Sequence, residues 1–221
     1  MESGVPGVKH EPDLAASREV SGRVLYERSR LRRQDYFQSP SSAQRGIRAS
    51  VIKLYMSRYL ISWKVGGEAG FGIKSAGLTF AKVCKRAGYF VFGYDEYPSL
   101  IRGGHNTYQV TVSESSVAST AEEVDILVVL NKDTFTRHAK ELNHGAVVIY
   151  DKTSLPITLT AAQKELHIKL VHVPLAALVE QAKGQPVMRN TISLGASQAV
   201  IGLPFSMLAS VIKQTFGHKS A

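Results

Sequence analysis

The stretch RYLISWKVGGEAGFGIKSAGLTFAKVCKRAG, residues 58–88, changes its hydrophobic pattern partway along. Residues 58–65 form a short apolar run that ends in glycines, which is typical of a strand. Over residues 72–87 the apolar side chains recur mostly at helical spacing, and Gly88 is expected to close that helix. The stretch therefore predicts a strand, a glycine turn and a helix, the repeating unit of an α/β fold.

The rest of the chain continues this alternation. We expect strands at residues 89–94, 106–113, 125–130, 146–150 and 167–173, and helices at 132–142, 174–183, 188–201 and 204–216. The helix 132–142 should stop near Asn143, His144 and Gly145. A loop, not a helix, leads into strand 106–113, which indicates a mixed sheet. We predict a mostly parallel, mixed sheet with helices on both faces over residues 58–217, then a short tail, 218–221.

Residues 1–57 differ from the rest of the chain in charge and hydrophobic pattern. They carry ten Lys or Arg against six Asp or Glu, which is +4 of the net charge of +9. Their apolar residues lack a sustained period, so we expect a basic, disordered N-terminal extension. An RNA-binding tail and an Arg-rich transit peptide are alternatives, but the six acidic residues count against a transit peptide. We favour translation from an upstream start, or a dispensable tail.

Cysteine content and hydropathy narrow the class of protein. Cys84 is the only cysteine, which excludes an internal disulfide, a cysteine metal cage and iron–sulfur ligation by this chain alone. One cysteine fits a reducing compartment, and we expect the cytoplasm. No apolar run approaches the roughly 20 residues of a membrane span, so no membrane partner is expected. Without the extension the charge is +5, which weakens the case for nucleic acid.

The glycine turn resembles a phosphate loop but breaks its rule. A triphosphate loop needs lysine directly after its last glycine, and here Ile73 stands between Gly72 and Lys74. We expect Ile73 to be the first apolar residue of the following helix and to pack on the sheet. The dinucleotide fingerprint fails too, because Ser75 stands where it needs glycine or alanine. Two interpretations stay open: the glycines bring backbone amides to an anion at the helix start, or they form a tight turn whose helix packs closely through Gly77.

A second motif, YDEYPSLIRGGHNTYQV over residues 94–110, follows the second strand and should reach the same sheet edge. Arg102 offers a fork-shaped donor for an anion or an interface, or a salt bridge to Asp95 or Glu96. His105 reads more readily as a structural hydrogen bonder than as a catalyst. The other histidines show no metal-ligand spacing, and we predict no catalytic residue and no metal site in this chain.

Taken together, GGxxGxGI, EYPSLIRGGHN, DILVVLN, HGAVVIYD and RNTISLGASQAVIGLP resemble the gamma domain of 2-oxoacid:ferredoxin oxidoreductases, the pyruvate/ketoisovalerate oxidoreductase family. The similarity covers residues 58–217, and the EYPS version looks closer to the 2-oxoglutarate and generic 2-oxoacid branch. It implies a three-layer α/β/α domain. It also carries over the site residues Gly66, Gly67, Gly70, Gly72, Ile73, Tyr97, Pro98, Ser99, Arg102, Gly103, Gly104, His105 and Asn106.

The resemblance implies a function at the level of a complex. Such an enzyme oxidatively decarboxylates a 2-oxoacid with thiamine diphosphate, passes electrons through iron–sulfur clusters to ferredoxin, and gives the acyl group to coenzyme A. The thiamine and cluster sites belong to other subunits or domains, here expected as alpha and beta partners. The gamma domain is associated with subunit packing and coenzyme A, and it should be inactive alone. Glu68 and Ala69 depart from the family pattern, and a carboxylate there would disfavour phosphate.

Alternatives to this function remain at the level of the sequence. The chain could be a stand-alone module for a nucleotide or other anion, or an RNA-binding protein through residues 1–57. It could also be a piece of a longer gamma–alpha fusion.

Overall fold

A computed structural model describes residues 60–97 and 104–217. All described residues belong to one unit of the chain. The predicted extension, residues 1–57, and the predicted tail, residues 218–221, lie outside the described residues. The predictions about them therefore stay predictions.

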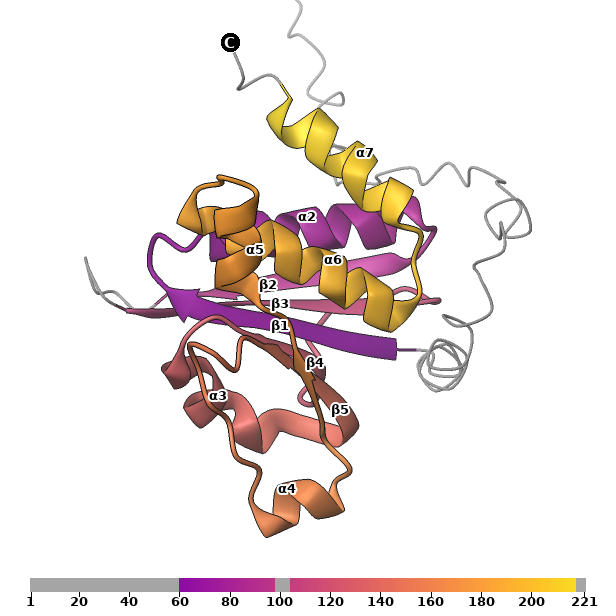
Figure 1. The fold of residues 1–221 in the computed structure, drawn as a ribbon. Coiled ribbons are helices and arrows are strands. Elements are labelled where there is room, and N and C mark those ends of the chain that lie inside the picture. Colours follow the sequence, from indigo (N-terminus) through magenta and orange to yellow (C-terminus); the bar gives the residue numbers. More distant parts are fainter. Residues whose placement is uncertain (1–59, 98–103, 218–221) are drawn as a thin grey trace, which may run out of the picture. The chain divides into compact units, whose positions relative to one another are not determined.

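The described residues build one six-stranded mixed sheet, with the strand order β2-β3-β1-β4-β5-β6 (Figure 1). The strands β1, β4, β5 and β6 are parallel neighbours, whereas β3 runs antiparallel to both β1 and β2. The strands are β1 (Leu60–Glu68), β2 (Phe90–Glu96), β3 (His105–Ser113), β4 (Val124–Val129), β5 (Leu142–Tyr150) and β6 (Lys169–His172). The mixed sheet expected from the loop before β3 is confirmed.

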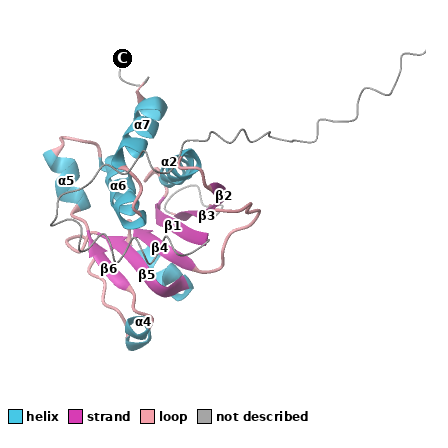
Figure 2. Ribbon diagram, turned by 90° about the vertical axis from the view of Figure 1, so that its right-hand side faces the viewer, coloured by secondary structure: helices cyan, strands magenta, loops and turns pink. Residues whose placement is uncertain are grey.

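Helices cover both faces of the sheet, which gives three layers (Figures 1 and 2). One face carries α2 (Ile73–Arg86), α5 (Leu175–Gln181), α6 (Arg189–Ile201) and α7 (Phe205–Phe216), with the 3-10 turn η3 (Pro186–Met188) leading into α6. The other face carries α3 (Lys132–His138), the 3-10 turn η2 (Ala139–Glu141) and the short α4 (Ala161–Glu165). The predicted α/β/α fold is thus confirmed.

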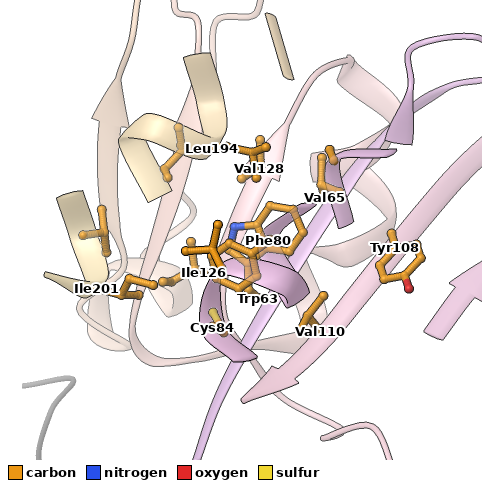
Figure 3. Close-up of a cluster of buried hydrophobic side chains, with 14 of the residues drawn as sticks. Trp63, Val65, Phe80, Cys84, Tyr108, Val110, Ile126, Val128, Leu194 and Ile201 are labelled. Atoms are coloured by element: carbon orange, nitrogen blue, oxygen red, sulfur yellow. The ribbon is translucent and has the colours of Figure 1, made fainter. Parts of the chain in front are cut away.

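Two apolar clusters hold the layers together. Under α2 and α6, Trp63 stacks on Phe80 with ring centroids 4.3 Å apart (Figure 3). The indole nitrogen of Trp63 also donates to Ser197 Oγ at 2.9 Å, so a buried polar group is satisfied inside the core. The second cluster lies on the opposite face, around Val124, Leu127, Val129, Val148 and Ile168.

Two predicted boundaries were wrong. The first strand continues to Glu68, because Gly66 and Gly67 pair with Thr107 and Asn106 of β3 instead of opening the turn. The helix expected at 132–142 ends at His138, and Asn143, His144 and Gly145 lie inside β5. There the register with β4 shifts, and Gly145 adopts a φ of 75°. Glycine accepts this left-handed conformation and so permits the irregularity.

No helix in the described part of the chain is long and apolar enough to cross a lipid bilayer.

Candidate functional site

The two motifs singled out in the sequence meet at one edge of the sheet. In the antiparallel pair β1–β3, Gly67 lies opposite Asn106 and Glu68 opposite His105. The amide of Ala69 then donates to the carbonyl of Gly104 at 3.2 Å, which ties the glycine turn to the start of β3. The predicted meeting of the two motifs is therefore confirmed for the described residues.

Gly66 and Gly67 make room for this chain's own side chains. A Cβ atom on Gly66 would lie 2.6 Å from Thr134 Cγ2, and one on Gly67 would lie 3.1 Å from Ile73 Cδ1. Ile73 is the first residue of α2 and is buried, as the sequence predicted. At these two positions the close approach is internal packing, in keeping with the tight-turn interpretation.

Beyond β1 the turn is held by α6. Gly72 has a φ of 68° and directly precedes α2, and the Asn190 side-chain amide donates to the Phe71 carbonyl. A Cβ atom on Gly72 would lie 2.8 Å from Asn190 Nδ2. Gly70 also has a positive φ, 92°, but a Cβ there would meet no atom within 4 Å. Of the four motif glycines, Gly70 alone faces open space.

The charges around the turn are already engaged or are negative. Lys74 Nζ lies 3.0 Å from Asp95 Oδ2, and this hydrogen bond and charge raise the pKa of Lys74. The same Nζ lies 5.8 Å from the centre of the Tyr97 ring. Glu68, the last residue of β1, is exposed and adds a carboxylate next to the turn. Asp95 thus has Lys74 as its partner; Pro98, Ser99, Arg102 and Gly103 lie outside the described residues.

His105 and Asn106 point to opposite faces of the sheet, because successive side chains of a strand alternate. Asn106 is buried on the α2 side, whereas His105 lies on the α3 side. The predicted site residues therefore do not form one cluster.

On the α3 side, His105 begins a chain of polar contacts. Its Nε2 lies 2.9 Å from His138 Nε2, and His138 Nδ1 lies 2.7 Å from Glu141 Oε1. Glu141 Oε2 in turn lies 2.5 Å from Lys64 Nζ, in a salt bridge whose lysine is buried. Burial, and then the charges of His138 and Arg137, lower the pKa of His105.

Sequence reasoning missed His138, Glu141 and Lys64 as members of the site. The available signal was the three-residue spacing of His138 and Glu141, which puts both on one face of a helical turn. Burial works to raise the pKa of Glu141, but hydrogen bonds from His138 and Lys64 hold it below the ordinary value. Among residues 60–97 and 104–217, no three His, Cys, Asp or Glu side chains gather to hold a metal ion.

Apolar side chains remain exposed beside the turn. Val187 is 48% and Met188 46% exposed, and both belong to η3 at the start of α6. Val187 touches the turn directly, since its Cγ2 would lie 3.0 Å from a Cβ on Gly72. Tyr97, 46% exposed, stands near Lys74 on the same side of the sheet. Val187 and Met188 are thus apolar side chains left exposed next to the glycine turn.

Comparison with known proteins gives one consistent result. The family model described as pyruvate ferredoxin/flavodoxin oxidoreductase matches residues 62–221. The 2-oxoacid:ferredoxin oxidoreductase subunit alpha of Saccharolobus solfataricus is 26% identical, and the match covers 71% of this chain and 30% of that protein. A Sulfolobus protein of the same name is 34% identical over 47% of this chain and 16% of its own length. The chain thus spans less than a third of these relatives.

Solved structures share the fold. The 2-oxoglutarate:ferredoxin oxidoreductase of Magnetococcus marinus, solved with 2-oxoglutarate, coenzyme A and succinyl-CoA bound, matches with a TM-score of 0.66 and 23% identity over 74% of this chain and 28% of that one. The gamma subunit of a keto/oxoacid ferredoxin oxidoreductase from Geobacter sulfurreducens matches with a TM-score of 0.61 and 18% identity. That match covers 70% of this chain and 84% of the gamma subunit.

Proposed function

The chain belongs to the pyruvate ferredoxin/flavodoxin oxidoreductase family, and we propose that it is the gamma component of a 2-oxoacid:ferredoxin oxidoreductase complex. The observation that carries this proposal is the end of the β1–β3 strand pair at which the glycine turn begins. The space beside Gly66, Gly67 and Gly72 is filled by the chain's own side chains, and apolar residues stand exposed near the turn. Such an edge is built to dock on another protein surface, and we assign the chain a packing role against the thiamine-binding alpha and beta components.

In this proposal the chemistry takes place on the partners. They would decarboxylate a 2-oxoacid on thiamine diphosphate, carry electrons over iron–sulfur clusters to ferredoxin, and release an acyl-CoA. The Cys84 thiol is fully buried, and burial raises its pKa well above the ordinary value, so it is an inert core side chain and no cluster ligand. This chain has no other cysteine. The proposed location is the cytoplasm.

Coenzyme A is the cofactor that the family resemblance associates with this domain. The described part of the edge fits its phosphates poorly, because Glu68 repels an anion and Lys74 is tied to Asp95. Only Gly70 offers an open backbone position. We therefore assign coenzyme A to the assembled complex, and to this chain the task of shaping the surface against which the partners close.

Reconstitution tests the proposal. The chain should co-purify with thiamine-binding partners encoded beside it, and its addition should raise 2-oxoacid-dependent ferredoxin reduction by the partners at least about tenfold. The chain alone should reduce no ferredoxin with any 2-oxoacid. Partners that decarboxylate and reduce ferredoxin equally well without the chain would contradict the assigned role.

A further inference from the structure

The polar chain under β1 ends in an atom without a partner. His105 Nδ1 is buried and has no hydrogen-bond partner, while His105 Nε2 faces His138 Nε2 at 2.9 Å. Two ring nitrogens at this distance repel each other unless a proton lies between them. The contact therefore requires that one of the two rings donate and the other accept.

Glu141 decides which ring donates. Its carboxylate, ionised because its pKa is low, lies 2.7 Å from His138 Nδ1, so that nitrogen must carry a proton. In a neutral His138 the Nε2 atom is then an acceptor. His105 must donate from Nε2, and its Nδ1 is left with a lone pair.

Adding one proton to the pair changes His105 Nδ1 from a hydrogen-bond acceptor into a donor. Three N–H groups are then spread over four ring nitrogens: one points to Glu141, one lies between the two Nε2 atoms, and the third is on His105 Nδ1. The result is the same whichever ring formally carries the charge. His105 Nδ1 thus accepts a hydrogen bond when the pair is neutral and donates one when the pair is protonated.

The surroundings of His105 favour its neutral ring near pH 7. Besides His138, the groups that face His105 are Arg137 and Asp133 of α3 and Glu96 of β2. Burial, His138 and Arg137 act against a charge on the ring, and the two acids offset them in part. Gly66 forms the wall on the β1 side, since a Cβ there would lie 3.1 Å from His105 Cε1.

We propose that His138 is a positioning residue which, held by Glu141 and Lys64, fixes His105 with Nδ1 as a hydrogen-bond acceptor at neutral pH. A neutral donor, such as a backbone amide or a hydroxyl, would satisfy this acceptor, whereas a phosphate or a carboxylate would not. This inference concerns the chain's own residues and does not depend on the proposed function.

Nitrogen-15 NMR of the imidazole rings in the full chain tests the proposal without any variant. At pH 7.5 we expect His138 protonated at Nδ1, His105 protonated at Nε2, and a scalar coupling between the two Nε2 nuclei. Acidification should protonate His105 Nδ1. Two rings that both carry Nε2–H, or that show no mutual coupling, would overturn it.

Variants separate positioning from simple packing. Glu141→Gln removes the charge that holds His138 and steadies a proton shared with His105, so the titration midpoint of His105 should fall by about one pH unit. Glu96→Gln is the matched control: Glu96 faces His105 without touching His138, and its loss should shift the midpoint much less. Equal shifts in both variants would count against the chain of contacts.

Two probes address the ligand class. Millimolar inorganic phosphate at pH 7.5 should leave the His105 Nδ1 resonance unchanged, and a saturable shift would mean an anion site. Micromolar Zn²⁺ should also leave both rings unchanged, and a stoichiometric shift of the two Nε2 resonances would mean a metal bridge in place of the shared proton.

Discussion

Gly77 of α2 and Tyr108 of β3 are in contact with no space for a methyl group between them. A Cβ atom on Gly77 would lie 2.1 Å from Cδ1 of the Tyr108 ring, which is buried. The helix that follows the glycine turn is therefore seated on the sheet as closely as a bare backbone allows. The tight-turn interpretation of the sequence assigned this role to Gly77.

Gly77→Ala should destabilise the fold by about 1–3 kcal/mol or more, because the ring or the helix must move. Gly195→Ala is the matched control in α6, where a Cβ would meet only Phe205 Cε2, at 3.9 Å. That substitution should be neutral or stabilise by up to about 1 kcal/mol through its helix propensity. Urea unfolding followed by circular dichroism measures both, and equal effects would contradict the packing argument.

Trp63→Phe should lower the free energy of unfolding, because it removes the hydrogen bond to Ser197 as well as side-chain volume from the core. Ser197 Oγ accepts from the indole at 2.9 Å and itself donates to the Ser193 carbonyl at 2.8 Å. A double-mutant cycle with Ser197→Ala should show a coupling of about 0.5–1.5 kcal/mol. Additive losses would mean that the indole N–H contributes nothing beyond its packing on Phe80.

The sequence predicted the order of elements because hydrophobic period and turn residues are local signals. It indicated a mixed sheet from the loop before β3, and it placed Ile73 at the start of the helix face that packs on the sheet. It put Gly66 and Gly67 in the turn, since glycine disfavours strands, but pairing with Thr107 and Asn106 overrides that preference. Partners such as His105 and His138 lie 33 residues apart and meet only through the topology.

Stability should fall as the solution is acidified below about pH 6.5, the ordinary value for histidine. The pKa of His105 is lowered in the folded state, so the unfolded chain binds its proton first and acid favours unfolding. The pKa of Glu141 is also lowered, and its contribution is lost at lower pH in the same direction.

His105→Asn should make the fall in stability with acidification smaller at the upper end of this pH range. One proton sets a ceiling of about 1.4 kcal/mol per pH unit, and the effect should be well below it because the ring is only half buried. Urea midpoints of the two proteins measured from pH 7.5 to 5 give the difference. A variant curve parallel to the wild-type curve would show that His105 does not contribute.

Coenzyme A should not bind the isolated chain with micromolar affinity. The described edge presents Glu68 and an occupied Lys74 where a phosphate would need free cations. Isothermal titration of the full chain should give no saturable heat up to about millimolar coenzyme A, whereas the reconstituted complex should bind. Micromolar binding by the chain alone would return coenzyme A to this domain.

Charge placed on η3 should break assembly without unfolding the chain. Val187 and Met188 are exposed beside the glycine turn, so glutamate at either position costs little in the free chain. If the partners bury this patch, Val187→Glu or Met188→Glu should weaken association at least about tenfold, because an unpaired charge would be desolvated. Leu166→Glu is the control: Leu166 is also exposed, but it caps α4 on the opposite face of the sheet. Co-purification and light scattering measure assembly, and a Leu166 variant that fails as badly as the η3 variants would place the docking surface elsewhere.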